Sequence, residues 1–361
     1  MKFYIVILME LLISSSTFAT SHELGKAEFL RGGDISMLLK FEELNAVFRN
    51  ADGKPENLIK IMTDHGCNFF RVRIFVNPTM NNAVIQDLPY VVELAKRIKK
   101  SGAKWLLDFH YSDTWADPSH QIKPSAWGEL SFPELERKVE AYTAHVITTL
   151  KENTALPDMV QIGNEITPGM IYPDGKLYGS GAGGWDQFAV LLKAGIRGVK
   201  KPLSNNQEVQ IMIHIAEHNP MKAHGFYKKL MELEVEYDVI GLSYYPNWHG
   251  NIENLKRLIT QTGVKLNKEV IVVETAYYAR EKHNTKGTTK HNLWPMTPEG
   301  QKQFLEDIVM VIKSTPNDLG AGVLWWYPES IPVKGINVWN GGKTALFDRK
   351  GHPRPALSVF K

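Results

Sequence analysis

The chain has 361 residues, a formal net charge of +3 and a hydrophobic fraction of 43%, which are ordinary values for a globular protein. Its 42 basic and 39 acidic side chains nearly balance, which excludes a dedicated nucleic-acid-binding protein, because the basic excess is too small to follow a phosphate backbone. The single cysteine, Cys67, excludes an intramolecular disulfide and a cysteine-based zinc cluster, and we expect it to be a buried thiol.

The first 19 residues are typical of a secretory signal peptide. Lys2 precedes an apolar run over residues 3–13, and Thr17 and Ala19 are the small side chains expected before a cleavage site. Glu10 is unusual within such a run, and the alternative is a buried N-terminal strand. We expect cleavage after Ala19, a catalytic domain over residues 20–361, and a location outside the cell or in the cell envelope without membrane insertion.

Short apolar runs alternate with amphipathic stretches along the rest of the chain. Their nearly continuous Val, Ile and Leu content is typical of parallel strands that are covered on both faces. The candidate strands are residues 29–35, 68–75, 103–110, 159–165, 209–215, 239–244, 270–276 and 322–326. Helix starts between them are indicated by Asp87, by the capping box Ser131-Phe132-Pro133-Glu134 and by Thr297-Pro298.

About eight strand–helix units predict an α/β fold, a single (β/α)8 TIM barrel without an interdomain linker. A doubly wound open sheet is the alternative. That fold predicts a glycine-rich phosphate turn after the first strand, and Arg31-Gly32-Gly33-Asp34 lacks the required continuation.

Polar and aromatic side chains collect at the C-terminal ends of the candidate strands, where barrels of this kind carry their chemistry. The candidates, in chain order, are Arg71, Arg73, Asp108, His110, Asn164, Glu165, His214, Tyr244, Glu274 and Trp326.

Glu165 and Glu274 each end a strongly apolar run, where an unpaired buried charge would be costly. One such glutamate could simply cap a helix, but two of them facing the same axis indicate a paired site. Paired carboxylates are the machinery of glycoside hydrolysis. One is protonated and donates to the leaving oxygen, while the other is ionised and attacks the anomeric carbon or activates water.

The two glutamates need different environments for these roles. We expect Arg71 and Arg73 to hold Glu274 anionic, and we favour Arg73 because it lies nearer the strand end. Tyr244 would add a hydrogen bond to Glu274. Glu165, with less compensation, would have a raised pKa and act as the acid. Either arginine alone could instead form a structural salt bridge.

Metal chemistry is not expected. His110 and His214 could be ligands, but the sequence has no HExxH or comparable spacing, and a lone histidine at a strand end more often makes hydrogen bonds. We therefore expect neither a metal nor a cofactor. Asn164 could reach the sugar hydroxyl beside the anomeric centre.

Four stretches carry a family resemblance: DFHYSDTWADP at 108–118, PDMVQIGNE at 157–165, DVIGLSYYP at 238–246 and VVETAY at 272–277. They resemble the endo-β-1,4-galactanases of glycoside hydrolase family 53, which belong to a large clan of retaining barrel enzymes. The likeness covers nearly the whole mature chain. It implies retaining, endo-acting cleavage of β-1,4-galactan, as in type I arabinogalactan of pectin side chains, with Glu165 as acid/base and Glu274 as nucleophile.

The chain departs from the family pattern in one place and lacks an optional feature of it. Tyr327, in Trp325-Trp326-Tyr327-Pro328, stands where the family usually has a glutamate, which affects the local loop and product length rather than the chemistry. Some bacterial relatives hold calcium in the late loops. Residues 280–291 are basic and lack a carboxylate cluster, so we expect no calcium site there.

Tryptophans supply candidate platforms for sugar rings, because stacking removes two apolar faces from water. Trp115, Trp248 and Trp326 are the candidates, and Trp339 could be a platform or could pack a loop. Trp105 and Trp127 are expected to be core or loop anchors.

Two other functions stay open. One is a β-glycanase of the same clan that acts on mannan or glucan. The other is a surface glycan-binding protein on a decayed barrel, which would usually have lost one of the two carboxylates. The near-neutral charge favours neutral galactan over the acidic pectin backbone. We expect a monomer that binds polysaccharide and no nucleic acid.

Overall fold

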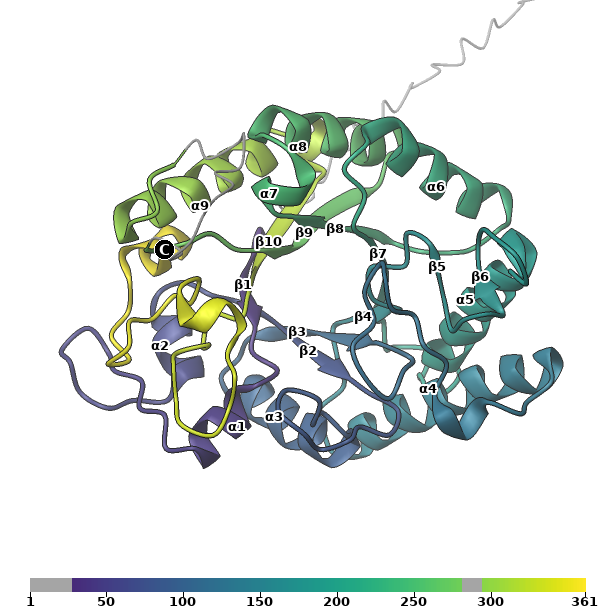
Figure 1. Ribbon diagram of the computed structural model, residues 1–361, viewed down its shortest axis with the longest axis horizontal. Coiled ribbons are helices and arrows are strands. Elements are labelled where there is room, and N and C mark those ends of the chain that lie inside the picture. Colours follow the sequence, from purple (N-terminus) through teal and green to yellow (C-terminus); the bar gives the residue numbers. More distant parts are fainter. Residues whose placement is uncertain (1–27, 281–293) are drawn as a thin grey trace, which may run out of the picture.

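The computed structural model describes residues 28–280 and 294–361. Eight parallel strands close into a barrel in the order β1-β10-β9-β8-β7-β4-β3-β2, and helices surround it (Figure 1). The predicted (β/α)8 barrel is therefore confirmed. The segment 1–19 lies outside the described residues, as does nearly all of the stretch 280–291.

All eight predicted barrel strands are present. Their bounds are β1 Leu30–Asp34, β2 Phe69–Ile74, β3 Lys104–Phe109, β4 Met159–Ile162, β7 Gln210–Ile215, β8 Val239–Tyr244, β9 Glu269–Thr275 and β10 Gly320–Trp326. Strand β4 ends earlier than expected, because Gly163 leaves the extended conformation with φ 81°. A small antiparallel pair, β5 Gly169–Met170 and β6 Gly175–Lys176, was not expected and lies in the following loop.

The helices lie between the strands. Their bounds are α1 Leu38–Glu43, α2 Leu58–Asp64, α3 Leu88–Lys100, α4 Phe132–Glu152, α5 Gly184–Lys200, α6 Pro220–Glu232, α7 Pro246–His249, α8 Ile252–Ile259 and α9 Pro298–Lys313. A π-helical turn, Thr260–Val264, continues α8. The 3₁₀ turns are Ser125–Trp127, Pro316–Asp318, Trp339–Gly342 and Pro355–Phe360.

The predicted helix starts are confirmed by their hydrogen bonds. Asp87 accepts from the backbone N–H of Tyr90 at the start of α3, and Thr297 accepts from that of Gly300 at the start of α9. At α4, the capping box links Ser131 and Glu134. Each of these caps satisfies N–H groups that the first helical turn leaves without a partner.

The hydrophobic core has two layers. A cluster inside the barrel consists of Phe69, Leu106, Met159, Met212, Val239, Ile271, Val273 and Leu324. A larger cluster lies between the strands and the surrounding helices, and it contains Cys67, Trp105 and Trp127, which are buried as expected. Packing on both faces explains why the strands are apolar at nearly every position.

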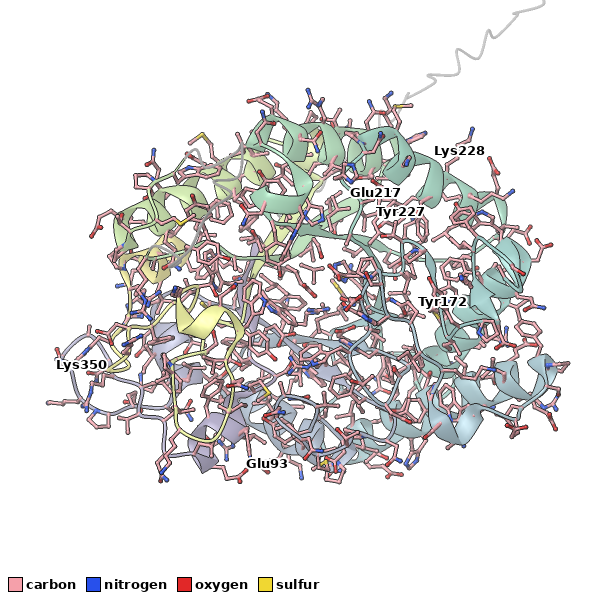
Figure 2. The ribbon with its side chains drawn as sticks, viewed as in Figure 1. Glu93, Tyr172, Glu217, Tyr227, Lys228 and Lys350 are labelled. Carbon is pink, nitrogen blue, oxygen red and sulfur yellow. The ribbon has the colours of Figure 1, made fainter. Side chains whose placement is uncertain are left out.

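The outer layer contains a buried hydroxyl that bonds to two strands at once. The hydroxyl of Tyr227 on α6 donates to the carbonyls of Ile213 and Gly241 on two neighbouring strands. Charged side chains such as Glu93, Lys228 and Lys350 lie at the outer edge of the molecule instead (Figure 2). Within the part of the chain that the structure describes, no helix is long and apolar enough to cross a membrane.

Replacing Met212 by alanine tests the packing inside the barrel. Met212 is fully buried, and Met212→Ala should lower the free energy of unfolding by about 2–5 kcal/mol because it leaves a cavity. Met310, which is 63% exposed on α9, is a matched control, and its substitution should change stability by less than about 0.5 kcal/mol. Urea denaturation measures both, and equal losses would contradict the assigned packing.

Candidate active site

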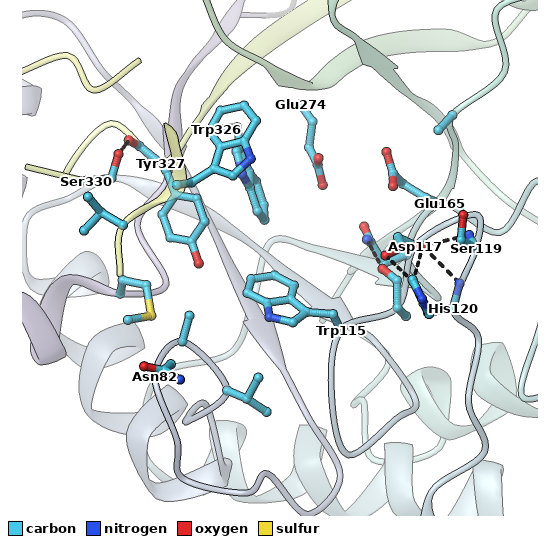
Figure 3. A pocket seen from close by; sticks show the side chains of 18 of the residues that line it. Asn82, Trp115, Asp117, Ser119, His120, Glu165, Glu274, Trp326, Tyr327 and Ser330 are labelled. Atoms are coloured by element: carbon cyan, nitrogen blue, oxygen red, sulfur yellow. Dashed lines mark hydrogen bonds and ion pairs between the residues drawn. The ribbon is translucent and has the colours of Figure 1, made fainter. Parts of the chain in front are cut away.

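A cavity of about 990 Å³ opens at the C-terminal ends of the barrel strands. Figure 3 shows the carboxyl groups of Glu165 and Glu274 projecting into it, with Trp115, Trp326 and Tyr327 along one side. The turn formed by Asp117, Ser119 and His120 lies on the other side, beyond Glu165. Both glutamates are therefore open to a ligand in one continuous space.

Glu165 reaches the cavity because the backbone turns sharply after β4. Gly163 has φ 81° and Glu165 itself has φ 48°, a left-handed conformation that is unfavourable for a residue with a Cβ atom. The turn lets two consecutive side chains, Asn164 and Glu165, both line the cavity, which the alternation of a regular strand would forbid. Backbone strain of this kind is common at functional sites.

Glu274 reaches the cavity through an irregularity in β9. Val272 pairs with Leu242 on β8, but the next pair is Glu274 with Ser243, so Val273 is an extra residue. Such a bulge changes which face the following side chains occupy. Val273 packs inside the barrel and Glu274 nevertheless lines the cavity above it.

Arg71 on β2 is the centre of the buried polar network. Its Nη1 donates to Glu274 Oε1 at 2.7 Å and to Asp34 Oδ2 at 3.3 Å. Its Nη2 donates to Asp108 Oδ2 at 2.8 Å and to Asn164 Oδ1 at 2.7 Å. Burial alone would lower the pKa of Arg71, but the three carboxylates outweigh it and raise that pKa, so the guanidinium stays charged.

The expectation that Arg73 would be the arginine beside Glu274 is wrong. Arg73 lies two residues further along β2. Its Nη1 lies 3.4 Å from Asp34 Oδ1, and its Nη2 donates to the Tyr327 hydroxyl at 2.8 Å. Its guanidinium also lies 4.4 Å from the ring centre of Trp115. Arg73 therefore supports the aromatic side of the cavity. Because it lies nearer the end of β2 than Arg71 does, its guanidinium lies beyond Glu274.

The expected hydrogen bond from Tyr244 to Glu274 is not present. The Tyr244 hydroxyl donates to the carbonyl of Gly250, and the ring stacks on Phe304 outside the barrel. The neighbouring Tyr245 donates to Glu274 Oε2 at 3.1 Å instead. Tyr245 has the same parity along the chain as Ser243, which also faces the site, so alternation along β8 explains the correction.

Glu165 has a different set of neighbours. Its Oε1 lies 2.6 Å from Ser243 Oγ, which in turn lies 2.9 Å from His214 Nε2. No arginine or lysine of the described residues forms an ion pair with Glu165, whereas Glu274 is paired with Arg71. The two carboxyls are thus differently compensated, as the sequence predicted.

The pKa values follow from these environments. Burial, and then the negative charge of Glu274, raise the pKa of Glu165 to about 8. Burial also raises the pKa of Glu274, but the charge and hydrogen bond of Arg71 oppose this, and the value is about 7. Both carboxyls therefore resist ionisation, and the ion pair with Arg71 favours the ionised form of Glu274.

Asp108 and His110 form a second buried pair at the end of β3. Their closest atoms, Oδ2 and Nε2, are 3.1 Å apart, and the backbone N–H of Ala116 donates to His110 Nδ1. Burial opposes ionisation of Asp108, but Arg71 and His110 hold its pKa below the usual range. Among the described residues, no group of three or more His, Cys, Asp or Glu side chains could hold a metal ion.

Aromatic side chains form much of the cavity wall. Trp115, Trp326, Trp339 and Trp248 all line it, so the structure brings together all four candidate platforms. Trp248 is 65% exposed, which is unusual for tryptophan and leaves its ring free to stack on a ligand. Tyr327 also lines the cavity, so the residue that departs from the family pattern faces the ligand space.

Several residues of this site were missed by the sequence reasoning. Ser243 and Tyr245 lie within a quoted motif, and strict alternation along β8 would have assigned both to the interior. Asp34 is the last residue of β1, and the argument that was applied to the acids near the ends of two other apolar strands applies to it as well. No sequence pattern indicated Glu329, because it follows β10 in an irregular loop.

Glu329 is fully buried beside Asp34 and Arg73. Its Oε1 accepts from the backbone N–H of Met37 at 3.1 Å, while Oε2 has no hydrogen-bond partner among the described residues. Burial, and then the charge of Asp34, raise the pKa of Glu329 to about 8. Glu329 is thus a second neutral carboxyl, and it belongs to the same loop as Tyr327.

Comparisons with known proteins agree with this geometry. Residues 30–360 match the model of glycosyl hydrolase family 53. The chain is 32% identical to an arabinogalactan endo-beta-1,4-galactanase of Cellvibrio japonicus, over 92% of this chain and 90% of the relative. It is 30% identical to an endo-beta-1,4-galactanase of Bacillus subtilis, over 92% and 86%. The solved catalytic domain of a family 53 protein from Ignisphaera aggregans superposes with a TM-score of 0.85 at 33% identity, covering 92% of this chain and 95% of that one.

Glu329 provides a test of the buried charge balance. A carboxyl whose folded-state pKa is raised stabilises the fold fully below its unfolded pKa and loses that contribution as the pH rises through the folded value, about 8. Glu329→Gln removes this dependence, so between about pH 5 and about pH 8 the variant should gain roughly 3 kcal/mol relative to the parent. Urea denaturation at both pH values measures the change.

The exposed Glu152 near the end of α4 is the control for that experiment. Glu152→Gln should leave the pH dependence of unfolding as it is in the parent. A Glu329→Gln curve that runs parallel to the parent curve would show that Glu329 is ionised in the folded protein.

Proposed function

The chain belongs to glycosyl hydrolase family 53 and is a glycoside hydrolase, and we propose that it cleaves internal β-1,4-galactosidic bonds of galactan by a retaining double displacement. Glu165 is the acid/base and Glu274 the nucleophile in this proposal. One observation carries it: two carboxyls face one open cavity at the ends of β4 and β9, and Arg71 forms an ion pair with Glu274 but not with Glu165.

The first half of the reaction needs a bound proton and a bare carboxylate. Arg71 and Tyr245 hold Glu274 in place through both of its oxygens, and the positive charge of Arg71 favours the ionised form. Glu274 attacks the anomeric carbon and forms a covalent glycosyl ester. Glu165 gives its proton to the glycosidic oxygen, so that the leaving sugar departs as a neutral alcohol.

The second half reverses the roles. Glu165 is now ionised, and it removes a proton from water as that water attacks the anomeric carbon and releases Glu274. The mutual electrostatic influence of Glu165 and Glu274 supports this exchange. Once the ester has formed, Glu274 no longer carries the charge that raised the pKa of Glu165, and Glu165 can serve as a base.

The choice of substrate rests on the relatives and on the cavity wall. Two relatives that match over most of their length are named as endo-β-1,4-galactanases. The wall offers tryptophan faces at several points, which suits a chain of neutral sugars. Asn164, fixed by Arg71, lies beside Glu165 and can bind the hydroxyl next to the anomeric centre.

We also propose that the enzyme is exported through the segment 1–19, which precedes the family match at residue 30. Expression in a secreting host followed by mass measurement of the protein should give a mature chain that begins at Thr20. An exported protein that retains Met1 would contradict this assignment.

The function is tested by digesting linear galactan, mannan and cellulose side by side and profiling the oligosaccharides. Galactan alone should release a series of galacto-oligosaccharides, and NMR of the first products should show the β-anomer at the new reducing end. Preferred release from mannan or cellulose would favour another β-glycanase. Binding of galactan with no new reducing ends would favour a glycan-binding protein, and an α-anomer would indicate an inverting mechanism.

The two glutamates should respond differently to truncation. Glu274→Ala should abolish turnover of galactan, because no covalent ester can form. Glu165→Ala should slow galactan cleavage by about 10²–10⁴-fold but largely spare an aryl galactoside with a good leaving group, which needs no proton. Steady-state kinetics on both substrates measure this, and two variants with the parental rate on galactan would remove both assignments.

Tyr245 and Tyr244 make a matched pair for testing the support of the nucleophile. Tyr245→Phe removes a hydrogen bond to Glu274 and should lower kcat on galactan by roughly 10-fold or more, since one hydrogen bond to a charged group is worth about 1.5–3 kcal/mol. Tyr244→Phe removes only a bond to the carbonyl of Gly250 and should keep kcat near the parental value. The reverse ranking would show that Tyr244 is the supporting group after all.

A further inference from the structure

A row of buried hydrogen-bonding groups leads from Arg71 to the carboxyl of Glu165. Its members are Asn164, His214 and Ser243, which come from the end of β4, from β7 and from β8. Asn164 Oδ1 lies 3.0 Å from His214 Nδ1, His214 Nε2 lies 2.9 Å from Ser243 Oγ, and Ser243 Oγ lies 2.6 Å from Glu165 Oε1. The direction of each hydrogen bond in this row depends on the one before it.

The first member of the row has a fixed orientation. Asn164 Oδ1 accepts from Arg71 Nη2 at 2.7 Å and from Gln161 Nε2 at 3.1 Å, and both of these groups can only donate. Asn164 Nδ2 donates to the carbonyl of Ala116 at 2.7 Å, and a carbonyl can only accept. The amide therefore cannot flip, and it presents an oxygen to His214.

An oxygen facing His214 Nδ1 at 3.0 Å requires a hydrogen between them, so Nδ1 carries the proton. Burial, and then the positive charge of Arg71, hold the pKa of His214 well below its usual value, so the ring is neutral and Nε2 is a bare acceptor. The backbone N–H of Glu165 also points at Nδ1, but from 3.4 Å, which makes it the weaker contact.

Only one protonation state of Glu165 then places a single hydrogen in each contact of the row between Asn164 and Glu165. With Glu165 protonated, its O–H donates to Ser243 Oγ, the Ser243 hydroxyl donates to Nε2 of His214, and Nδ1–H donates to Asn164. With Glu165 ionised, the hydroxyl must turn toward the carboxylate, and Ser243 Oγ must accept from Nε2–H. A neutral ring would then bring two acceptors, Nδ1 and Asn164 Oδ1, face to face.

We propose that His214 is held as the Nδ1–H tautomer and that, through Ser243, it keeps the proton on Glu165 in the resting enzyme. His214 and Ser243 are positioning residues, since they act on the reaction only through Glu165. Arg71 consequently favours opposite states of the two glutamates. It stabilises the anion of Glu274 by direct contact, and through four successive hydrogen bonds it favours the acid form of Glu165, against the direct effect of its positive charge, which lowers the pKa of Glu165.

Other charged and titratable groups also bear on this row. Those that act on His214 are Arg71, Asp108, His110 and His249. Those that act on Glu165 are Glu274, Arg71 and Asp117. The negative charge of Glu274 raises the pKa of Glu165 in the same direction as the row does, so a pH profile alone is insufficient and the tautomer must be observed directly.

The direct test is ¹⁵N NMR of the histidine-labelled parent enzyme near neutral pH, with the His214 signals identified by their loss in His214→Gln. The proposal expects a protonated Nδ1 and an unprotonated Nε2. A ring protonated at Nε2, or at both nitrogens, overturns it. This measurement needs no substrate, so it stands even if Glu165 proves not to be the catalytic acid.

The second test rests on the proposed role of Glu165 and uses the pH dependence of kcat/KM on galactan. Ser243→Ala removes the acceptor for the Glu165 proton, so the alkaline limb should move to lower pH by about one unit. Ser243→Thr keeps the hydroxyl and should restore the parental limb. If Ser243 were simply a donor to an ionised Glu165, its loss would move the limb to higher pH, and this result or an unchanged limb overturns the proposal.

Discussion

The four hydrogen bonds of the Arg71 guanidinium are the constraint on which the rest of the site depends. They join groups that the chain delivers from four different strand ends: Asp34, Asp108, Asn164 and Glu274. Three carboxylates packed together without this cation would repel one another, and a buried anion left without a partner costs several kcal/mol. The barrel supplies the position of Arg71, and Arg71 in turn fixes the charge and orientation of the groups that face the ligand.

Closing eight parallel strands into a ring brings their C-terminal ends to one face, but regular strands would not place these side chains correctly. Glu165 depends on a left-handed turn after Gly163, and Glu274 on the extra residue Val273 in β9. Both are departures from ideal geometry at the two positions where chemistry is proposed. The inner core packed below them, which includes Val273, holds the strained backbone in place.

Sequence reasoning succeeded where one periodic signal dominated. Apolar runs and helix caps gave the eight strands and the starts of α3, α4 and α9, and acids at the ends of apolar strands gave Glu165 and Glu274. It failed for Arg73 and Tyr244, where it had to choose between neighbours of similar chemistry. Arg71 and Arg73 point to the same side of β2, so only the distance along the strand separates them. Tyr244 and Tyr245 point to opposite sides of β8, so the parity of Ser243 and Tyr245 separates them.

The sequence by itself therefore determined the barrel, the family and the pair of glutamates, because burial patterns and short motifs are properties of the linear chain. The tertiary structure alone decided which arginine holds Glu274, and that Ser243 and His214 form a hydrogen-bonded row to Glu165. These contacts join residues far apart in the chain at distances near 3 Å. Hydrogen bonds weaken within a fraction of an ångström, a precision that only the closed and packed barrel provides.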